Sequence, residues 1–232
     1  PAMWERSLDW MLAVGRYGYT YNFQWLGRPI IQYPQDIVAF QEIVHNTKPD
    51  IIIETGIAHG GSLVLSASLL SLLDVMEGQD PRRSERKVVG IDIDIRKHNR
   101  KALDEHALRY KMELIEGSSV DPSIVSSVTQ LADNADRVLV ALDSNHTEEH
   151  VARELDVYAN LVSIGSYCIV FDTVVEYMPL EFTQERDWGP GNSPLTAVNN
   201  FVAENSCFEI DHRFDSRLLI TVARGGYLKR IS

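Results

Sequence analysis

The chain has little cysteine, little positive charge and no long apolar run. Two cysteines are present in 232 residues, and Cys168 lies in an apolar, strand-like run where it packs as a small hydrophobe, so we expect no disulfide and a cytoplasmic setting. The formal net charge is −11, which disfavours nucleic acid and anionic membranes as partners. No apolar run approaches the span of a membrane helix, and no signal-like segment is recognisable at the start.

What the sequence does contain is a series of short apolar runs that alternate with helix-like segments. Consecutive strand-then-helix units predict a mostly parallel, doubly wound α/β sheet with helices on both faces. The predicted parallel strands are 51–53, 88–94, 112–117, 138–143 and 166–173. Two later runs, 208–210 and 218–222, are expected to form an antiparallel hairpin at the sheet edge.

Residues 1–35 differ in composition from residues 36–232, which we expect to form the main domain. Aromatic residues crowd into this N-terminal stretch, and several glycines follow a short amphipathic helix. Such a segment cannot build its own core. We interpret it as a structural arm that packs on the main domain or on another subunit, and the alternative is a lid that contacts substrate.

A Gly-rich loop follows the first predicted strand. Glu54 ends that strand, Gly56, Gly60 and Gly61 follow, and a helical pattern begins at Ser62. The spacing G-x-x-x-G-G is neither the dinucleotide fingerprint nor a Walker A loop. An acid before the glycines suits a ligand with a positive or donor-rich end, such as S-adenosylmethionine. The alternative is an ordinary Gly-rich turn between a strand and a helix.

Other acidic residues also lie where predicted strands end. The 88–94 strand ends in acidic residues, at the place where a carboxylate in a doubly wound nucleotide fold accepts hydrogen bonds from ribose hydroxyls, and Asp92 is our choice for this role. Asp94 is the second choice for this role, although it is equally suited to cap the next helix. His59, within the Gly-rich loop, is a further candidate for contact with a nucleoside.

Asp143 and Asp172 follow two further strands and should meet at the same rim of the sheet. Two carboxylates brought together repel each other unless a cation lies between them, and carboxylate oxygens suit Mg²⁺. Thr173 offers a third oxygen. His146 is predicted to act as a general base on a substrate hydroxyl, or alternatively as a ligand to a softer metal. The alternative for the acids is helix capping or ion pairing. The other histidines, His45, His98, His106, His150 and His212, are expected to be surface or packing residues.

Two of these motifs resemble those of class I S-adenosylmethionine-dependent methyltransferases. The run 53–62 looks like their first motif, and 90–94 looks like their second. More specifically, Glu-Thr-Gly-x-x-x-Gly-Gly-Ser at 54–62, with 142–146, 171–173 and the 21–34 segment, resembles the cephalosporin hydroxylase family. The resemblance extends from about residue 20 to the C-terminus.

The resemblance implies a Rossmann-like methyltransferase that binds S-adenosylmethionine and Mg²⁺, has a small N-terminal domain and forms oligomers. The implied substrate is a hydroxylated cephalosporin in the 7α-methoxylation of cephamycin biosynthesis. The resemblance places the cofactor on Glu54, Gly56, Ser62, Asp92 and Ser119, with Asp92 at the ribose and Ser119 near the adenine. The predicted cofactor site is completed by His59, Gly60 and Asp143.

In the same resemblance, Asp143 and Asp172 would hold the metal, and His146 stands where catechol O-methyltransferase has its basic lysine. The chain departs from the pattern at Thr173, where that enzyme has Asn, and at Phe171, where many relatives have Glu. Both departures concern the third metal ligand.

We therefore predict a Mg²⁺-dependent O-methyltransferase, and two other classes stay open. One is a cephalosporin hydroxylase, or its accessory subunit acting with a partner protein of the same pathway. Oxygen insertion needs a redox cofactor or iron, and His146 with Asp143 supplies at most part of a two-His-one-carboxylate set. The other is a non-catalytic binding scaffold.

Overall fold

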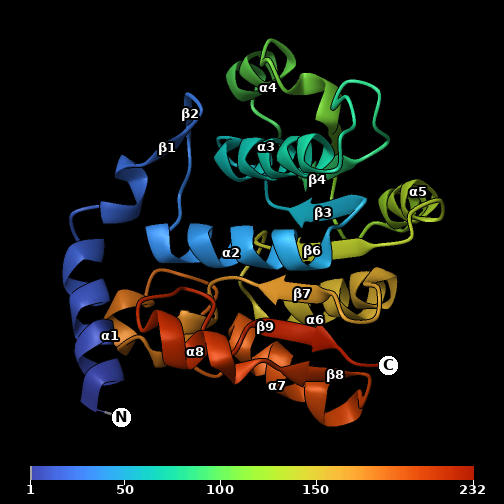
Figure 1. The fold of residues 1–232 in the computed structure, drawn as a ribbon. Helices are drawn as coiled ribbons and strands as arrows, with labels where there is room; N and C mark the ends of the chain where they lie inside the picture. The colour runs from blue at the N-terminus through green and yellow to red at the C-terminus, as the bar shows by residue number, and fades with distance from the viewer. Residues whose placement is uncertain (1) are drawn as a thin grey trace.

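A computed structural model describes residues 2–232, and its centre is a seven-stranded sheet (Figure 1). The order across the sheet is β5-β4-β3-β6-β7-β9-β8. The strands are β3 (Ile51–Thr55), β4 (Lys87–Asp92), β5 (Met112–Glu116), β6 (Val138–Leu142), β7 (Tyr167–Val170), β8 (Phe208–Ile210) and β9 (Tyr227–Arg230). The first five pair in parallel, and β9 pairs antiparallel with both β7 and β8.

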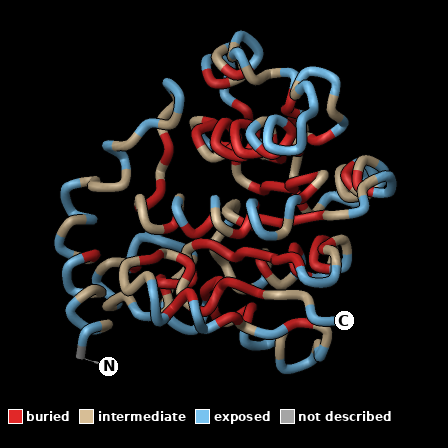
Figure 2. Tube along the Cα trace, in the orientation of Figure 1, coloured by how far each residue is buried: buried red, intermediate tan, exposed pale blue. Residues whose placement is uncertain are grey.

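Helices cover both faces of this sheet, as the alternating pattern predicts. One apolar cluster contains Ile52 of β3 and residues from α2 (Pro34–Thr47), α3 (Gly61–Met76), α4 (Lys97–Asp104) and α8 (His212–Leu218). The other contains Ile51 and Ile53 with residues from α5 (Pro122–Ala132), α6 (Glu148–Tyr158) and α7 (Pro194–Glu204). Successive side chains of a strand point to opposite faces, so β3 supplies both clusters. Figure 2 shows the strands buried along most of their length. The predicted doubly wound sheet is confirmed.

The N-terminal segment begins with a helix and continues as short pieces of structure. These are α1 (Ala2–Gly15), η1 (Tyr19–Asn22), β1 (Gln24–Trp25) and β2 (Arg28–Pro29). The segment packs on the chain between β7 and α7, which includes η4 (Thr173–Tyr177) and η5 (Leu180–Phe182). The Trp4 and Tyr177 ring centroids are 5.7 Å apart, and the Arg16 guanidinium lies 5.0 Å from the Phe182 ring centroid. Two segments far apart in sequence therefore support each other.

The two remaining short helices are η2 (Arg109–Lys111) and η3 (Ala159–Leu161). Within residues 2–232, none of the helices combines the length and apolar character needed to cross a membrane.

The predicted strand at 218–222 is wrong. Leu218 ends α8, and the backbone of Leu219 has a positive φ of 58°. The Thr221 hydroxyl and the Val222 N–H then donate to the buried carboxylate of Asp36, the latter at 3.0 Å. An apolar, β-branched run looks like a strand locally, but here a contact with α2 fixes it as a loop. The antiparallel edge itself is confirmed, with β9 in place of the predicted strand.

A group of buried charges ties α3 to β4 and to the turn before β5. Asp74 and Lys111 are both fully buried, and their charged atoms are 2.6 Å apart. The second oxygen of Asp74 accepts from the Arg86 guanidinium at 2.9 Å and from the Ser84 hydroxyl at 2.7 Å. Asp74 is thus the one anion that two buried cations share.

We predict that Asp74→Ala lowers the free energy of unfolding by about 3–5 kcal/mol, because it leaves Lys111 and Arg86 buried without their common counter-ion. Lys111→Met should cost clearly less, since Asp74 keeps Arg86 and Ser84. Urea unfolding followed by circular dichroism measures both variants. Equal losses for the two would contradict the central place given to Asp74.

Candidate functional site

The site forms where β3 and β6 end side by side. Gly56 follows β3 with φ 88°, a conformation that L side chains rarely adopt. A Cβ at this position would lie 2.0 Å from the carbonyl oxygen of Asp143, which follows β6. The loop then turns through Gly60, also left-handed, into α3. The glycine therefore lets two strand ends approach each other more closely than any side chain allows.

Two cavities open on either side of this approach. The first, which we call the arm-side cavity, has a volume of about 320 Å³ and is bordered by the N-terminal arm, the loop 56–62 and the end of β6. The second, the Asp92-side cavity, has a volume of about 430 Å³ and lies over the ends of β4 and β5. Both volumes are typical of small-molecule sites. The two cavities share Gly56, Ala58, Asp143 and Ser144, so they are neighbours across the same loop.

Asp92 lies in the Asp92-side cavity together with Ser119. One oxygen of the Asp92 carboxylate accepts from the N–H groups of Ile57 and Ala58, at 2.8 and 3.1 Å. This acid therefore braces the Gly-rich loop as well as bordering the cavity. The structure brings both predicted nucleoside contacts to one place, and their roles stay predictions.

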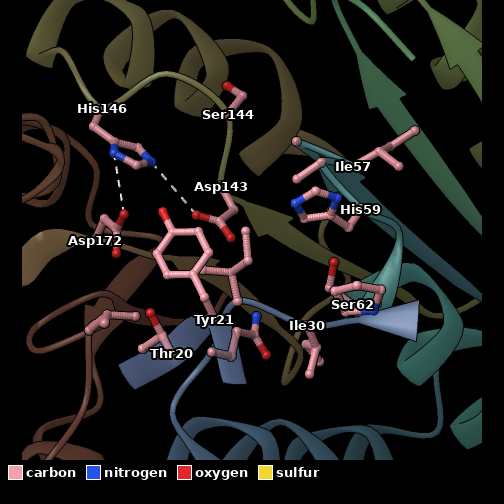
Figure 3. Close-up of a pocket in the computed structure, with 17 residues that line it drawn as sticks. Thr20, Tyr21, Ile30, Ile57, His59, Ser62, Asp143, Ser144, His146 and Asp172 are labelled. Atoms are coloured by element: carbon pink, nitrogen blue, oxygen red, sulfur yellow. Dashed lines mark ion pairs between the residues drawn. The ribbon is translucent and has the colours of Figure 1, made fainter. Parts of the chain in front are cut away.

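The predicted contacts of the Gly-rich loop divide between several places. His59 and Ser62 border the arm-side cavity (Figure 3), whereas Asp92 borders the Asp92-side cavity. His59 and Asp92 therefore do not line the same cavity. Gly60 forms the N-cap of α3 and borders neither the arm-side cavity nor the Asp92-side cavity. Glu54 lies behind the loop and accepts hydrogen bonds from the hydroxyls of Ser62 and Ser66.

Burial raises the pKa of Glu54 to about 7, and the negative charge of Asp143 adds to the effect, although the Ser62 hydrogen bond opposes it. Glu54 is 3% exposed and borders neither the arm-side nor the Asp92-side cavity, but it lines a much smaller cavity together with Ser62 and Asp143. Glu54 therefore supports the Gly-rich loop through its hydrogen bonds with the Ser62 and Ser66 hydroxyls.

Asp143, His146 and Asp172 come together at the rim, as the strand ends predict. One ligand atom from each lies within 4.8 Å of the others. His146 Nδ1 is 3.2 Å from Asp172 Oδ2, and its Nε2 is 3.7 Å from Asp143 Oδ1 (Figure 3). We call these residues the rim triad. Two carboxylates fit a hard cation such as Mg²⁺, and an imidazole beside them is also a possible ligand.

Burial and the charges of neighbouring groups together shift the pKa values in the rim triad. Burial lowers the pKa of His146, but the two neighbouring carboxylates outweigh it and raise the pKa to about 9. Burial raises the pKa of Asp143 to about 6, and Asp172 adds to this effect while His146 opposes it. Without a cation, the protonated imidazole therefore offsets part of the negative charge of the two carboxylates.

Thr173 does not join the rim triad. Its side chain is fully buried, and its hydroxyl lies 2.7 Å from the Arg224 carbonyl and 3.2 Å from the Val222 carbonyl. The hydroxyl donates to the backbone that leads into β9 and therefore points away from the carboxylates. This placement does not favour Thr173, the predicted third metal ligand, and His146 is the third group that the structure brings to the two carboxylates.

The sequence reading missed several residues that border the cavities. Thr20, Tyr21 and Ile30 of the arm border the arm-side cavity (Figure 3), whereas we had interpreted the arm as structural. His150, interpreted as a surface or packing residue, borders the Asp92-side cavity with Ser119. The sequence signal for His150 as a cavity residue is its position near the start of α6, directly after the loop that contains Asp143.

A family model described as Rhamnosyl O-methyltransferase/CmcI matches residues 17–231. This chain belongs to that family. A rhamnosyl O-methyltransferase of Mycobacterium tuberculosis is 30% identical over 183 residues, which are 78% of this chain and 65% of the relative. One of Mycobacterium leprae is 26% identical over 208 residues, which are 89% of this chain and 82% of the relative. The chain thus spans about two-thirds of the length of the tuberculosis protein.

Solved structures of the CmcI branch show the fold. An apo structure of CmcI has a TM-score of 0.58 and 19% identity over 91% of this chain and 77% of that one. A structure of CmcI with Mg and SAM has a TM-score of 0.55 and 16% identity over 91% and 78%. The fold of this family member is therefore that of the Rossmann-like methyltransferases, as predicted.

We predict that Gly56→Ala disrupts both cavities, because its Cβ would press on the backbone of Asp143. Gly78→Ala is the matched control, since Gly78 also has a positive φ (73°) but open space around it. Backbone strain alone should cost roughly 1 kcal/mol, and Gly56→Ala should cost clearly more. Thermal unfolding compares the two, and equal losses would show that the close approach tolerates a methyl group.

We also predict that Glu54→Gln changes how stability depends on pH. A carboxyl group whose pKa is raised on folding stabilises the fold below its unfolded pKa near 4.5, and this stability is lost as pH rises through about 7. The amide of the Glu54→Gln variant does not ionise, so the variant does not lose this stability as pH rises. At pH 8 the variant should therefore be more stable than the parent by on the order of 3 kcal/mol, and equal to it at pH 4.

Urea unfolding at both pH values, without cofactor, measures this difference. Glu113→Gln, at an exposed position of β5, is the control and should match the parent at both pH values. A Glu54→Gln curve parallel to that of the parent would mean that Glu54 titrates normally.

Proposed function

We propose that this protein is an S-adenosylmethionine- and Mg²⁺-dependent O-methyltransferase that acts on a hydroxyl group of a small molecule. The observation that carries the proposal is the position of the rim triad, at the point where the two cavities share Gly56 and Asp143. A nucleoside on the Asp92 side and an acceptor on the arm side would meet there. The family match and the CmcI structure with Mg and SAM support this reading.

In this proposal the residues of the chain position the reactants. Asp92 and Ser119 would hold the nucleoside, while the arm and the loop 56–62 would shield the acceptor from water. Asp143 and Asp172 would hold the cation, with His146 beside them. When bound, the cation would supply the positive charge that stabilises negative charge on an acceptor oxygen.

His146 would take the proton of the acceptor hydroxyl. The acceptor oxygen would form a bond to the methyl carbon as the bond from carbon to sulfur breaks, which leaves S-adenosylhomocysteine. A cation held by the carboxylates would offset the charges that keep the imidazole protonated, so His146 would be available as a base.

The acceptor class is the finer part of the proposal. The two mycobacterial relatives described above are rhamnosyl O-methyltransferases, so a rhamnosyl hydroxyl is the first candidate. A 7-hydroxycephalosporin is the second, because the motifs at 54–62, 142–146 and 171–173 resemble the cephalosporin hydroxylase family. A partner protein and a homo-oligomer stay expectations.

The hydroxylase alternative receives no support from the rim. Within residues 2–232 the rim group joins one histidine to two carboxylates, whereas non-haem iron oxygenases use two histidines and one carboxylate. The scaffold alternative makes a different prediction, namely nucleoside binding without turnover.

The test is calorimetric titration with S-adenosylmethionine, with and without Mg²⁺, followed by turnover assays. Methyl α-L-rhamnopyranoside and 7α-hydroxycephalosporin C are the acceptor probes, and S-adenosylhomocysteine is the measured product. Saturable binding and Mg²⁺-stimulated product formation with either probe would support the proposal. A protein that does not bind S-adenosylmethionine under either condition would overturn it.

The sharpest variant for the metal role is Asp172→Asn. Asp172 borders the arm-side cavity but not the Asp92-side cavity, whereas Asp143 borders both. Asp172→Asn should therefore reduce turnover by at least about a hundredfold while S-adenosylmethionine affinity in the absence of Mg²⁺ changes less than about threefold. Asp133→Asn, at an exposed acid directly after α5 that borders neither cavity, should leave both unchanged. Full activity of Asp172→Asn would remove the metal from the mechanism.

A further inference from the structure

The hairpin of β1 and β2 lies beside α3 and connects the arm to the Gly-rich loop (Figure 1). Trp25 of β1 donates from Nε1 to the Ser68 hydroxyl of α3 at 3.0 Å. His106, which follows α4, donates from Nε2 to the Leu26 carbonyl at 3.1 Å. Arg28 of β2 makes the third contact, which is with the loop itself. The hairpin is therefore fixed both to the helices and to the loop that lies between the two cavities.

The Arg28 guanidinium holds the loop by its carbonyl groups. Its Nε and Nη2 donate to the His59 carbonyl at 2.9 and 2.5 Å, and Nη2 also donates to Asn99 Oδ1 at 2.8 Å. Asn99 is 2% exposed, and its Nδ2 donates in turn to the Ala58 carbonyl at 2.8 Å. All of these acceptors are neutral. The planar fork of donors on Arg28 thus serves the loop backbone, directly and through Asn99.

Ala58 is held from two sides. Its φ is 46°, a conformation that residues other than glycine keep only when their surroundings fix it. Its N–H donates to the Asp92 carboxylate at 3.1 Å, and its carbonyl accepts from Asn99. Ala58 also borders both cavities. The shape of their shared wall therefore depends on Asp92 on one side and on Arg28 with Asn99 on the other.

The arm backbone also lies directly against the loop. A Cβ at Gly61 would be 2.2 Å from the Pro29 carbonyl oxygen and 2.6 Å from Ile30 Cα, so no side chain fits between the two segments. Pro29 and Ile30 border the arm-side cavity, and Arg28 directly precedes them. A change in the loop is therefore passed to one wall of the arm-side cavity.

We propose that Arg28 is a positioning residue that couples the two cavities, because it transmits to the arm the order that a ligand in the Asp92-side cavity gives to the loop. The inference rests on the proposed function and adds the residue that links its two binding sites. A ligand that packs against Ala58 reduces the motion of the loop, and groups bonded to the loop lose motion with it. Since such coupling is reciprocal, a ligand on the arm side would also strengthen binding on the Asp92 side.

Hydrogen exchange measured by mass spectrometry tests this on the unmodified protein, with S-adenosylhomocysteine as the probe and calorimetry to show binding. The reporter is segment 19–31, which contains the Ile30 N–H bonded to the Phe23 carbonyl at 3.1 Å. Coupling between sites is typically a factor of about 5 or more, so saturating ligand should slow exchange of this segment at least about fivefold.

Binding that leaves the exchange of segment 19–31 unchanged would overturn the inference and leave the proposed function intact. A protein that does not bind S-adenosylhomocysteine would overturn the proposed function and the inference with it.

Arg28→Leu localises the effect, because it removes the guanidinium donors to the loop. The ratio of the exchange rates of segment 19–31 without and with ligand should fall below about twofold, while calorimetry still shows saturable binding. A purely structural role would raise the exchange of the arm equally in both states and leave this ratio unchanged. A ratio as large as that of the unmodified protein would therefore remove Arg28 from the coupling.

Arg16→Leu is the matched control. It removes another cation of the arm, but Arg16 is exposed and contacts the Phe182 ring instead of the loop. This variant should keep the full ratio, and loss of the ratio in both variants would show that any weakening of the arm is sufficient. The comparison on the unmodified protein stands even if Arg28→Leu folds poorly.

Discussion

The close contact between the ends of β3 and β6 is the constraint on which the site depends. With hydrogen in place of a side chain at Gly56, the backbone of Asp143 can lie against the loop. The Asp143 N–H also donates to the Thr55 carbonyl at 3.0 Å, which continues the parallel pairing of the two strands to the rim. The cavities on both sides take their shared wall from this contact. A change in the distance between the two strand ends would therefore alter both cavities at once.

Electrostatics at the rim follow from the same arrangement. Parallel strands bring their carboxyl ends to one edge, and here Asp92 ends β4, while Asp143 and Asp172 come shortly after β6 and β7. The negative charges of these acids are stabilised in two different ways. Backbone amides of the loop satisfy Asp92, whereas the imidazole of His146 partly neutralises the other two. Only the second arrangement leaves like charges close together, and that is the arrangement a cation would stabilise.

Much of this was readable in the sequence because it depends on local patterns. The apolar runs, the glycine spacing and the acids at strand ends predicted a mostly parallel sheet without a strand order, yet they placed Asp143, His146 and Asp172 at one rim. Topology alone brings such residues together. The 54–62 loop was likewise recognisable from its glycines.

What the sequence could not show depends on contacts between distant segments. The run at 218–222 became a loop because Asp36, far away in the chain, takes its polar groups. Thr173 turned from the rim because the carbonyls before β9 were within reach. His150 faced the cavity because α6 starts immediately beyond the Asp143 loop, and the sequence gives no angle for that helix. Side-chain direction is set by packing, which residue patterns do not encode.

The arm packs on the chain between β7 and α7 through aromatic and cation–π contacts, such as that of the Arg16 guanidinium with the Phe182 ring centroid at 5.0 Å. Neither segment contributes a strand to the main sheet. The part of the arm-side cavity wall that the arm supplies, which includes Thr20, Tyr21 and Ile30, is thus separate from the main sheet, whereas another part of that wall is shared with the Asp92-side cavity. During evolution, substitutions in the arm can therefore change which molecule binds in the arm-side cavity without any change to the sheet.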